Sequence, residues 1–309
     1  MATHIVTGTA GFIGSHVTDT YIAAGHEVFV VDDLSTGKRE NLNPRAHFIH
    51  ADIMDLAVRK LISAEKIDVV NHHAAQMDVR RSVADPLFDA RVNLLGMLNV
   101  LEGAREAKVK KVVFSSSGGT VYGEQETFPA SESHSTHPIS PYGVSKRAGE
   151  HYLYFYSVEY GIPYLALRYA NIYGPRQDPH GEAGVVAIFT LRLFSETQPV
   201  INGDGKQTRD YVFVKDVARA NLAALHTDFC GPINIGTGIE TDVNQLFHHL
   251  RTLTNSSLPE THGPAKPGEQ RRSVLAWDRA KDLLGWRPEV GIEEGLRQTV
   301  EFFRSRQQH

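Results

Sequence analysis

The sequence predicts an α/β protein built on a doubly wound parallel sheet, followed by a smaller C-terminal region. Short apolar runs alternate with longer amphipathic stretches through the first half of the chain, a pattern typical of βαβ units. A glycine-rich turn joins the first apolar run to the first amphipathic stretch. Right-handed crossovers would cover both faces of such a sheet with helices and place ligands at the carboxyl ends of the strands.

Six short runs in the first half predict strands, because they are apolar and end near polar or turn-forming residues. They cover residues 4–7, 28–31, 47–50, 69–71, 112–115 and 165–169. The stretches between them predict helices over residues 11–24, 58–65, 86–107 and 142–160.

The second half of the chain is less regular. Residues 173–184 hold two prolines and three glycines, too many for a helix or a central strand. Strands are expected at residues 209–214 and 232–235, and helices at 187–195, 217–225, 244–253, 278–284 and 292–305. Residues 255–271 are expected to form a loop. We therefore predict one domain over residues 1–170, to which the chain returns around 210–240, and a second over 171–309.

Composition excludes several classes of protein. The 32 lysines and arginines nearly balance 36 aspartates and glutamates, and a net charge of -4 without a basic run argues against nucleic acid as a partner. The single cysteine, Cys230, permits no internal disulfide and is typical of a reducing compartment. A strand predicted directly after Met1 leaves no room for a signal peptide, and the apolar runs are too short to span a membrane. We expect a cytoplasmic protein with no membrane partner.

The glycine-rich turn predicts a dinucleotide site. Gly8, Gly11 and Gly14 follow a predicted strand and open a predicted helix that begins with Phe12 and Ile13. Glycines at this spacing permit a tight strand-to-helix turn and let backbone N–H groups approach a pyrophosphate at the helix N-terminus.

An acidic residue in the expected place indicates which dinucleotide. Asp32 ends the second predicted strand, 18 residues after Gly14, where a carboxylate binds the adenosine ribose hydroxyls of NAD and repels the 2′-phosphate of NADP. Lys38 and Arg39 follow closely and act against that preference. After the third strand, Asp52 and Ile53 are candidates to flank the adenine.

A second motif predicts acid–base chemistry. Tyr142 and Lys146 are four residues apart, so they share one face of a helix, and an ammonium group near a phenol lowers the tyrosine pKa. Ser115, Ser116 and Ser117 end the fifth predicted strand, where their hydroxyls would face the ligand crevice.

Taken together, these motifs resemble those of the extended short-chain dehydrogenase/reductase superfamily, and most closely its nucleotide-sugar epimerases of the UDP-glucose 4-epimerase type. The resemblance covers nearly the whole chain. It rests on the glycine turn and on residues 31–37, 73–75, 93, 115–117, 142, 146, 168–171 and 209–211. It implies a Rossmann domain for NAD, a UDP-sugar substrate bound by the C-terminal domain, and a homodimer formed through helices 86–107 and 142–160.

The resemblance also implies a role for each catalytic residue. Tyr142 resembles the base that takes the sugar 4-hydroxyl proton, and Lys146 the residue that holds the nicotinamide ribose and lowers the Tyr142 pKa. Ser117 resembles the hydroxyl that completes the proton path. One extra residue in the segment 117–122, relative to the commoner family spacing, leaves Ser116 and Thr120 as alternatives for that role.

The positions that match the family's ligand contacts form two groups. The implied NAD site consists of Gly8, Gly11, Phe12, Ile13, Gly14, Asp32, Asp33, Leu34, Ser35, Thr36, Gly37, Asp52, Ile53, His73, Ala74, Ala75, Gln76, Asn93, Ser115, Tyr142, Lys146 and Tyr169. The implied substrate site consists of Ser117, Tyr142, Asn171, Gly184, Val185, Arg209, Tyr211, Lys266, Glu269 and Arg272.

Some matches are stronger than others. Asn171 and Arg209 match diphosphate ligands, an anion that suits an arginine fork and amide donors, and Glu269 resembles the acid on the uridine ribose. Lys266 stands where many relatives have arginine, so Arg272 is an alternative for the second phosphate contact. Met77 replaces a lysine of some relatives, and we expect no cofactor contact there.

The same resemblance orders the candidate reactions. Hydride leaves the sugar C4 and returns to the opposite face, so NAD ends unchanged. Related dehydratases carry an Asp-Glu pair where Gly118 and Gly119 stand here, and related decarboxylases carry a glutamate, which favours an epimerase. Ser273 falls near the family's gate over the sugar C2 substituent, where a small residue would also admit the N-acetyl sugars.

Two other functions stay open. One is an epimerase or oxidoreductase acting on another nucleotide sugar such as UDP-glucuronate. The other is a non-catalytic dinucleotide sensor, against which Tyr142 and Lys146 count, because a sensor has no need of a base. The pairs His72–His73, His134–His137 and His248–His249 lack accompanying ligands, so no metal site is predicted.

Overall fold

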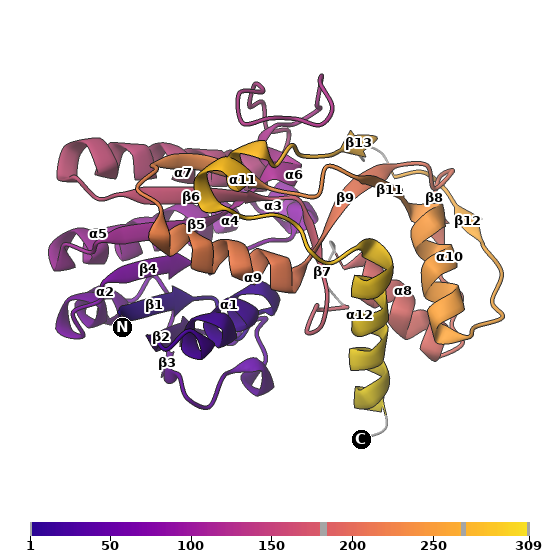
Figure 1. The fold of residues 1–309 in the computed structure, drawn as a ribbon, viewed down its shortest axis with the longest axis horizontal. Coiled ribbons are helices and arrows are strands. Elements are labelled where there is room, and N and C mark those ends of the chain that lie inside the picture. Colours follow the sequence, from indigo (N-terminus) through magenta and orange to yellow (C-terminus); the bar gives the residue numbers. More distant parts are fainter. Residues whose placement is uncertain (1, 180–183, 267–269, 308–309) are drawn as a thin grey trace.

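The computed structural model describes residues 2–179, 184–266 and 270–307. Its largest element is a seven-stranded parallel sheet with the strand order β10-β6-β5-β4-β1-β2-β3 (Figure 1). The strands are β1 Thr3–Thr7, β2 Glu27–Asp32, β3 His47–His50, β4 Val69–His72, β5 Lys111–Ser117, β6 Tyr164–Tyr169 and β10 Gly231–Ile235. The strand order reverses between β1 and β4, which makes their carboxyl ends the expected ligand crevice. The doubly wound fold predicted from the sequence is confirmed.

Helices cover both faces of this sheet, because each face is apolar. On one face, α1 (Phe12–Ala23) packs against α9 (Val214–Ala223), and Val17, Tyr21 and Ala218 share a buried cluster there. On the other face, the buried cluster draws on α2 (Leu56–Ala64), α5 (Met97–Ala107) and α7 (Pro141–Tyr160). Tyr21 also donates a hydrogen bond to the carbonyl of Asn221 at 3.1 Å, which ties α1 to α9.

The second half of the chain forms a smaller unit beside the carboxyl edge of the large sheet (Figure 1). A four-stranded sheet joins β7 (Asn171–Tyr173), β9 (Thr208–Phe213), β11 (Glu240–Asp242) and β13 (Arg272–Ser273). The pair β8 (Ile201–Asn202) and β12 (His262–Gly263) lies apart from it. The helices α8 (Val185–Phe194), α10 (Val243–Thr254) and α12 (Ile292–Gln307) supply most of this unit's own apolar core.

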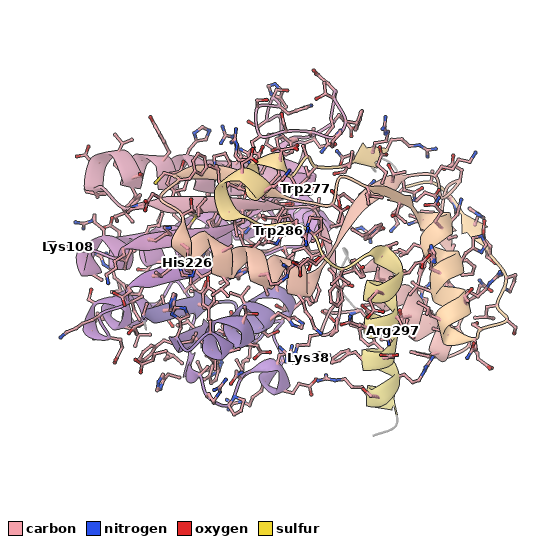
Figure 2. All side chains as sticks on the ribbon, viewed as in Figure 1. Lys38, Lys108, His226, Trp277, Trp286 and Arg297 are labelled. Carbon is pink, nitrogen blue, oxygen red and sulfur yellow. The ribbon has the colours of Figure 1, made fainter. Side chains whose placement is uncertain are left out.

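One strand-to-helix junction connects the two units without a linker. Phe213 ends β9 in the small sheet and is also the N-cap of α9, which packs on the large sheet. The segment after the small sheet returns to the same place through α11 (Asp278–Leu284). There Trp286 donates its indole N–H to the carbonyl of Asp216 at 2.8 Å, and its ring meets Trp277 edge to face. Figure 2 labels both indoles beside α9 and α11.

The structure corrects several predicted elements. The helix expected over 86–107 consists of α4 (Pro86–Ala90), a π-helical segment, η2 (Arg91–Gly96), and α5. The helix expected at 217–225 begins three residues earlier, at Val214, and the loop expected at 255–271 contains β12. Two short helices, α3 (Val79–Ala84) and α6 (Gly118–Val121), were not predicted, and neither were β7, β8, β11 and β13.

Four histidines with lowered pKa values make stability depend on pH. Burial, and then the neighbouring His26, lowers the pKa of His4 to about 4. Burial also lowers the pKa of His16 to about 4, and the pKa values of His72 and His73 to about 3. A histidine with a lowered folded-state pKa binds fewer protons in the folded chain than in the unfolded chain. Its stabilising contribution is therefore complete above about pH 6.5 and is lost as the pH falls through that value toward the folded-state pKa.

We predict that His4→Gln flattens this pH dependence. The variant removes one group that must stay neutral in the fold, so between pH 7 and pH 4 it should lose up to about 3 kcal/mol less stability than the wild type. Urea unfolding at a series of pH values measures the slope. Parallel curves for His4→Gln and the wild type would contradict the prediction.

Candidate functional site

The turn between β1 and α1 requires glycine at two positions. Gly8 has a φ of +71°, in the left-handed region, and a Cβ there would lie 2.6 Å from the backbone nitrogen of Ala74. A Cβ on Gly14 would lie 2.4 Å from the carbonyl oxygen of Gly8. Gly11 is the N-cap of α1 and no side chain caps the helix, so its first-turn N–H groups are open to an anion. This cradle fits the pyrophosphate of a dinucleotide.

Asp32 ties the end of β2 to this turn. Its carboxylate accepts hydrogen bonds from Ala10 N at 2.9 Å and Leu34 N at 2.8 Å, and burial raises the pKa of the group. Each carboxylate oxygen keeps a second lone pair, which is what a ribose diol requires. The next acid, Asp33, instead accepts from the backbone and hydroxyl of Ser35 in a local turn.

The remaining predicted cofactor residues lie along the same edge of the sheet. They follow β2, β3 and β4 or end β5 and β6, and they include Thr36, Gly37, Asp52, Ile53, His73, Ala75, Ser115 and Tyr169. Gln76 and Asn93 bond reciprocally: Gln76 N donates to Asn93 Oδ1 and Asn93 Nδ2 to the Gln76 carbonyl, both at 2.9 Å. Met77 is exposed. The parallel register thus gathers residues that are far apart in the chain.

The structure brings the three predicted catalytic side chains together. Helix α7 starts at Pro141 with Ser140 as its N-cap, which directs Tyr142 and Lys146 at the end of β5. The Tyr142 hydroxyl lies beside Ser117, whose hydroxyl acts to lower the Tyr142 pKa. Lys146 is 3 % exposed; its Nζ donates to the Ser115 carbonyl at 2.8 Å and lies 5.7 Å from the centre of the Tyr142 ring.

The electrostatics of this pair differ from the expectation that Lys146 lowers the Tyr142 pKa. Burial and then the charge of Asp89 raise the pKa of Tyr142, and the hydrogen bond to Ser117 only partly opposes them. Burial lowers the pKa of Lys146 to about 8, with Asp89 acting in the opposite direction. The cost of burying the phenolate therefore dominates the pKa of Tyr142.

Of the alternatives to Ser117, Ser116 faces away from the crevice. Its hydroxyl donates to Glu150 at 2.6 Å, and Glu150 also receives two hydrogen bonds from Arg168, at 2.9 and 2.6 Å. This ion pair is almost completely buried, and Arg168 also donates to the Tyr122 hydroxyl at 2.9 Å. Thr120 lies in α6, where its hydroxyl is buried with no hydrogen-bond partner in the described part of the chain. The contact with Tyr142 favours Ser117.

Most of the predicted substrate residues come from the smaller unit. Asn171 on β7 pairs in register with Tyr211 on β9, two residues beyond Arg209, and α8 begins at Val185 with Gly184 as its N-cap. Their elements face the carboxyl edge of the large sheet (Figure 1). Asn171 also reaches the end of β5, because its Oδ1 lies 3.8 Å from where a Cβ on Gly119 would be.

Arg272, the alternative for the second phosphate contact, lies on β13 beside Glu240. Its guanidinium donates to Glu240 at 3.0 and 2.6 Å and lies 3.7 Å from the centre of the Phe128 ring, so it already has partners. Lys266 is exposed, and Glu269 lies outside the described residues. Ser273 is buried on β13, in register with Arg209.

Two negative findings complete the description. In the ranges that the structure describes, no group of three or more histidine, cysteine, aspartate or glutamate side chains is placed to hold a metal ion. His72 instead bonds the Thr7 hydroxyl at 2.8 Å, and His134 accepts from Glu126 N at 2.9 Å. Among the described helices, none combines the length and the apolar character needed to cross a membrane.

Comparison with known proteins agrees with this geometry. The chain belongs to the NAD-dependent epimerase/dehydratase family, whose model matches residues 4–236. The expectation of NAD as cofactor is thereby confirmed for the family.

Its relatives include UDP-glucose 4-epimerases. The enzyme of Mycolicibacterium smegmatis is 46% identical over 311 residues, which cover 98% of this chain and 99% of that protein. The crystal structure of UDP-glucose 4-epimerase from Thermotoga maritima with UDP-glucose is 49% identical, with a TM-score of 0.97 over 99% of both chains. The Thermus thermophilus enzyme in complex with NAD is 44% identical, with a TM-score of 0.93 over 98% of this chain and 99% of that one.

We predict that Gly118 and Gly119 respond differently to a methyl group. A Cβ on Gly118 would lie 2.4 Å from Leu275 Cδ1 and 3.2 Å from the Arg168 carbonyl, whereas at Gly119 the nearest atom is 3.8 Å away. Gly118→Ala should destabilise the protein by about 1–3 kcal/mol and lower turnover by displacing Ser117. The matched variant Gly119→Ala should be stable and active. Denaturant unfolding and turnover measure both effects, and equal behaviour of the two variants would refute the prediction.

Proposed function

We propose that this protein is a UDP-hexose 4-epimerase that interconverts UDP-glucose and UDP-galactose with bound NAD. The observation that carries the proposal is the contact of Tyr142 with Ser117, beside Lys146, at the edge of the sheet that also holds the glycine turn. Its relatives in the family and the UDP-glucose and NAD named for two of the solved structures support the same activity.

The chain's own residues divide the work as follows. Ser117 bridges the sugar O4 and the Tyr142 hydroxyl, so the O4 proton passes to Tyr142 as the C4–H bond breaks. When bound, NAD would supply a reversible hydride acceptor for C4. Lys146 holds a positive charge beside the phenol and the nicotinamide ribose. The reversed proton transfer then completes the opposite configuration at C4, after the 4-keto sugar has turned over in the site.

The two structural units suit the two ligands. In the proposal, residues 1–170, together with the returning segment around 210–240, bind NAD, and residues 171–309 bind the nucleotide sugar. Asn171 and Arg209 hold the diphosphate, because an amide and a guanidinium provide N–H donors of suitable geometry for phosphate oxygens. A nucleotide fixed at its diphosphate leaves the hexose free to present either face to Ser117.

The structure argues against two rival functions, that of a dehydratase and that of a dinucleotide sensor. A dehydratase of this family would need acidic side chains at residues 118 and 119, and Gly118 has no space for one against Leu275. A sensor would have no use for a buried lysine beside a tyrosine that contacts a serine hydroxyl.

The buried Ser273, in register with Arg209, supports acceptance of UDP-N-acetylglucosamine as well, since serine is smaller than the tyrosine that would block an N-acetyl group.

We predict that purified protein, given UDP-galactose without added cofactor, produces UDP-glucose in an equilibrium mixture. Chromatography of the products measures the conversion, and parallel incubation with UDP-N-acetylglucosamine decides the N-acetyl specificity. Tyr142→Phe should keep its nucleotide, detected in the supernatant after denaturation, but lose at least about 100-fold in turnover. Stoichiometric consumption of NADH would instead indicate an oxidoreductase. Full activity in Tyr142→Phe would show that another group is the base.

We further propose that the protein is a homodimer through α7 and the adjacent segment 86–107. Helix α7 carries an apolar stripe: Val144, Phe155 and Val158 lie on one helix face and are 51 %, 48 % and 68 % exposed. Leu87 and Leu95, from α4 and η2, which pack against α7, are 78 % and 57 % exposed. A second copy would bury two such faces against each other as a four-helix bundle.

The dimer proposal predicts that Val158→Arg produces monomers. An arginine at this exposed position costs a folded monomer little, but it would place an unpaired charge in the interface. Size-exclusion chromatography with light scattering should report about twice the chain mass for the wild type and a single chain mass for the variant. Leu56→Arg, at the equally exposed start of α2, should remain dimeric. A monomeric wild type would disprove the proposal.

A cytoplasmic location completes the proposal. Cys230 is the one cysteine of the sequence, and it is exposed. A chain with one free thiol has no internal disulfide for an oxidising compartment to maintain, which is typical of a protein kept in a reducing compartment.

A further inference from the structure

We propose that Asp89 is a positioning residue of this site, which couples the predicted cofactor loop to the catalytic helix and supplies the negative charge that accompanies Lys146. The proposal rests on the proposed epimerase function. Asp89 lies in α4 and is fully buried, with 0 % exposure. A buried carboxylate is costly unless it is well hydrogen-bonded, so its neighbours indicate what it is for.

The carboxylate joins two segments that carry the site. Its Oδ2 accepts a hydrogen bond from the Ser145 hydroxyl at 2.6 Å, and its Oδ1 accepts from Asn93 Nδ2 at 2.9 Å and Gln76 Nε2 at 3.1 Å. Ser145 stands on α7 between Tyr142 and Lys146. Gln76 and Asn93 belong to the loop after β4 and to the π-helical segment, which the family resemblance assigns to NAD.

The π-helix explains how one carboxylate reaches both segments. A wider turn over Arg91–Gly96 begins directly after α4, and Asn93 within it bonds both Asp89 and Gln76. Such turns are rare and are frequently found at functional sites. A shift of Asp89 would therefore move the cofactor loop and the Tyr142–Lys146 turn together.

The charge of Asp89 acts on both catalytic groups. The donors to its oxygens are a hydroxyl and two amides, which leave the negative charge without a counter-charge in direct contact. That charge raises the pKa of Tyr142 and the pKa of Lys146. Because burial alone takes the lysine toward neutrality, the carboxylate favours the protonated ammonium that the site uses.

Other titratable groups near the pair contribute less. From β4, His72 and His73 are neutral at pH 7, because burial lowers the pKa of each to about 3. Further along α7, Glu150 is balanced by its ion pair with Arg168 of β6. Of the other ionisable side chains on the elements packed against α7, Arg80, Arg81, Arg91 and Glu106 are exposed, Glu102 pairs with Arg105, and Arg147 pairs with Glu150. The buried Lys111 of β5 donates to the carbonyls of Ala224 and Thr227.

The test compares pH profiles of kcat/KM for UDP-galactose in the NAD-containing wild type and in Asp89→Asn. Asparagine keeps the shape, accepts from Asn93 and Gln76 through its oxygen, and donates to Ser145 through its nitrogen, so only the charge is lost. The active form pairs a deprotonated Tyr142 with a protonated Lys146. Losing the negative charge lowers both pKa values, and both limbs of the bell should move to lower pH by about one unit.

Two further variants separate charge from position. Ser145→Ala removes the hydrogen bond between α7 and Asp89 but keeps the negative charge of Asp89. In this variant kcat should fall, while KM and both limbs of the pH profile stay unchanged. Asp216→Asn removes an equally buried carboxylate on α9, which bonds Arg219 and the backbone of Glu289 and Val290. It should lower stability without moving the limbs. Unfolding curves and the nucleotide released on denaturation accompany each profile.

Each outcome has a defined meaning. Absence of epimerisation by the wild type would reject the proposed function. If the wild type is active and a folded, NAD-containing Asp89→Asn keeps the wild-type limbs, the role of Asp89 is overturned. If Asp89→Asn does not fold, Ser145→Ala decides: a lowered kcat with unchanged KM supports the positioning role, and wild-type turnover rejects it.

Discussion

The buried ion pair between Glu150 and Arg168 determines the geometry of the candidate site. Two charges taken out of water are stable only when each fully satisfies the other, and here the guanidinium and carboxylate meet in a two-pronged contact. Glu150 lies one helical turn beyond Lys146 and two turns beyond Tyr142. Fixing it against β6, and against Ser116 of β5, fixes the rotation of α7 and so the direction in which the tyrosine and lysine point.

Sequence reasoning predicted the large sheet well because its strands are apolar runs whose burial requires no knowledge of their neighbours. It failed for elements whose structure depends on contacts with residues distant in the sequence. The two- and three-residue strands β8, β11 and β13 form because neighbouring strands hold them in register. The spacing of apolar residues also does not distinguish the π-helical turn at Arg91–Gly96 from an α-helix. An acid such as Asp89 within an amphipathic stretch suggests a solvent-facing position, yet it is completely buried.

The same distinction applies to the site. The spacing of Tyr142 and Lys146, and the serines at the end of a strand, predicted side chains that the fold does bring together. The choice between Ser116 and Ser117 required Glu150, and the engagement of Arg272 required Glu240, both distant in the sequence. The direction of the Tyr142 pKa depends on burial, which motif spacing does not report. The nearly balanced net charge is compatible with anionic ligands, because a few local donors suffice to bind them.

The junction at Phe213 has a mechanical consequence. Since β9 passes into α9 without a linker, a displacement of the strand that carries Arg209 and Tyr211 is transmitted to the helix. Tyr21 receives that displacement through Asn221, and it also accepts a hydrogen bond from Asn71 of β4 at 2.8 Å. The two units therefore have no independent hinge at this point. The position of Arg209 is in this way tied to α1, the helix that the glycine turn opens, because α9 packs against α1.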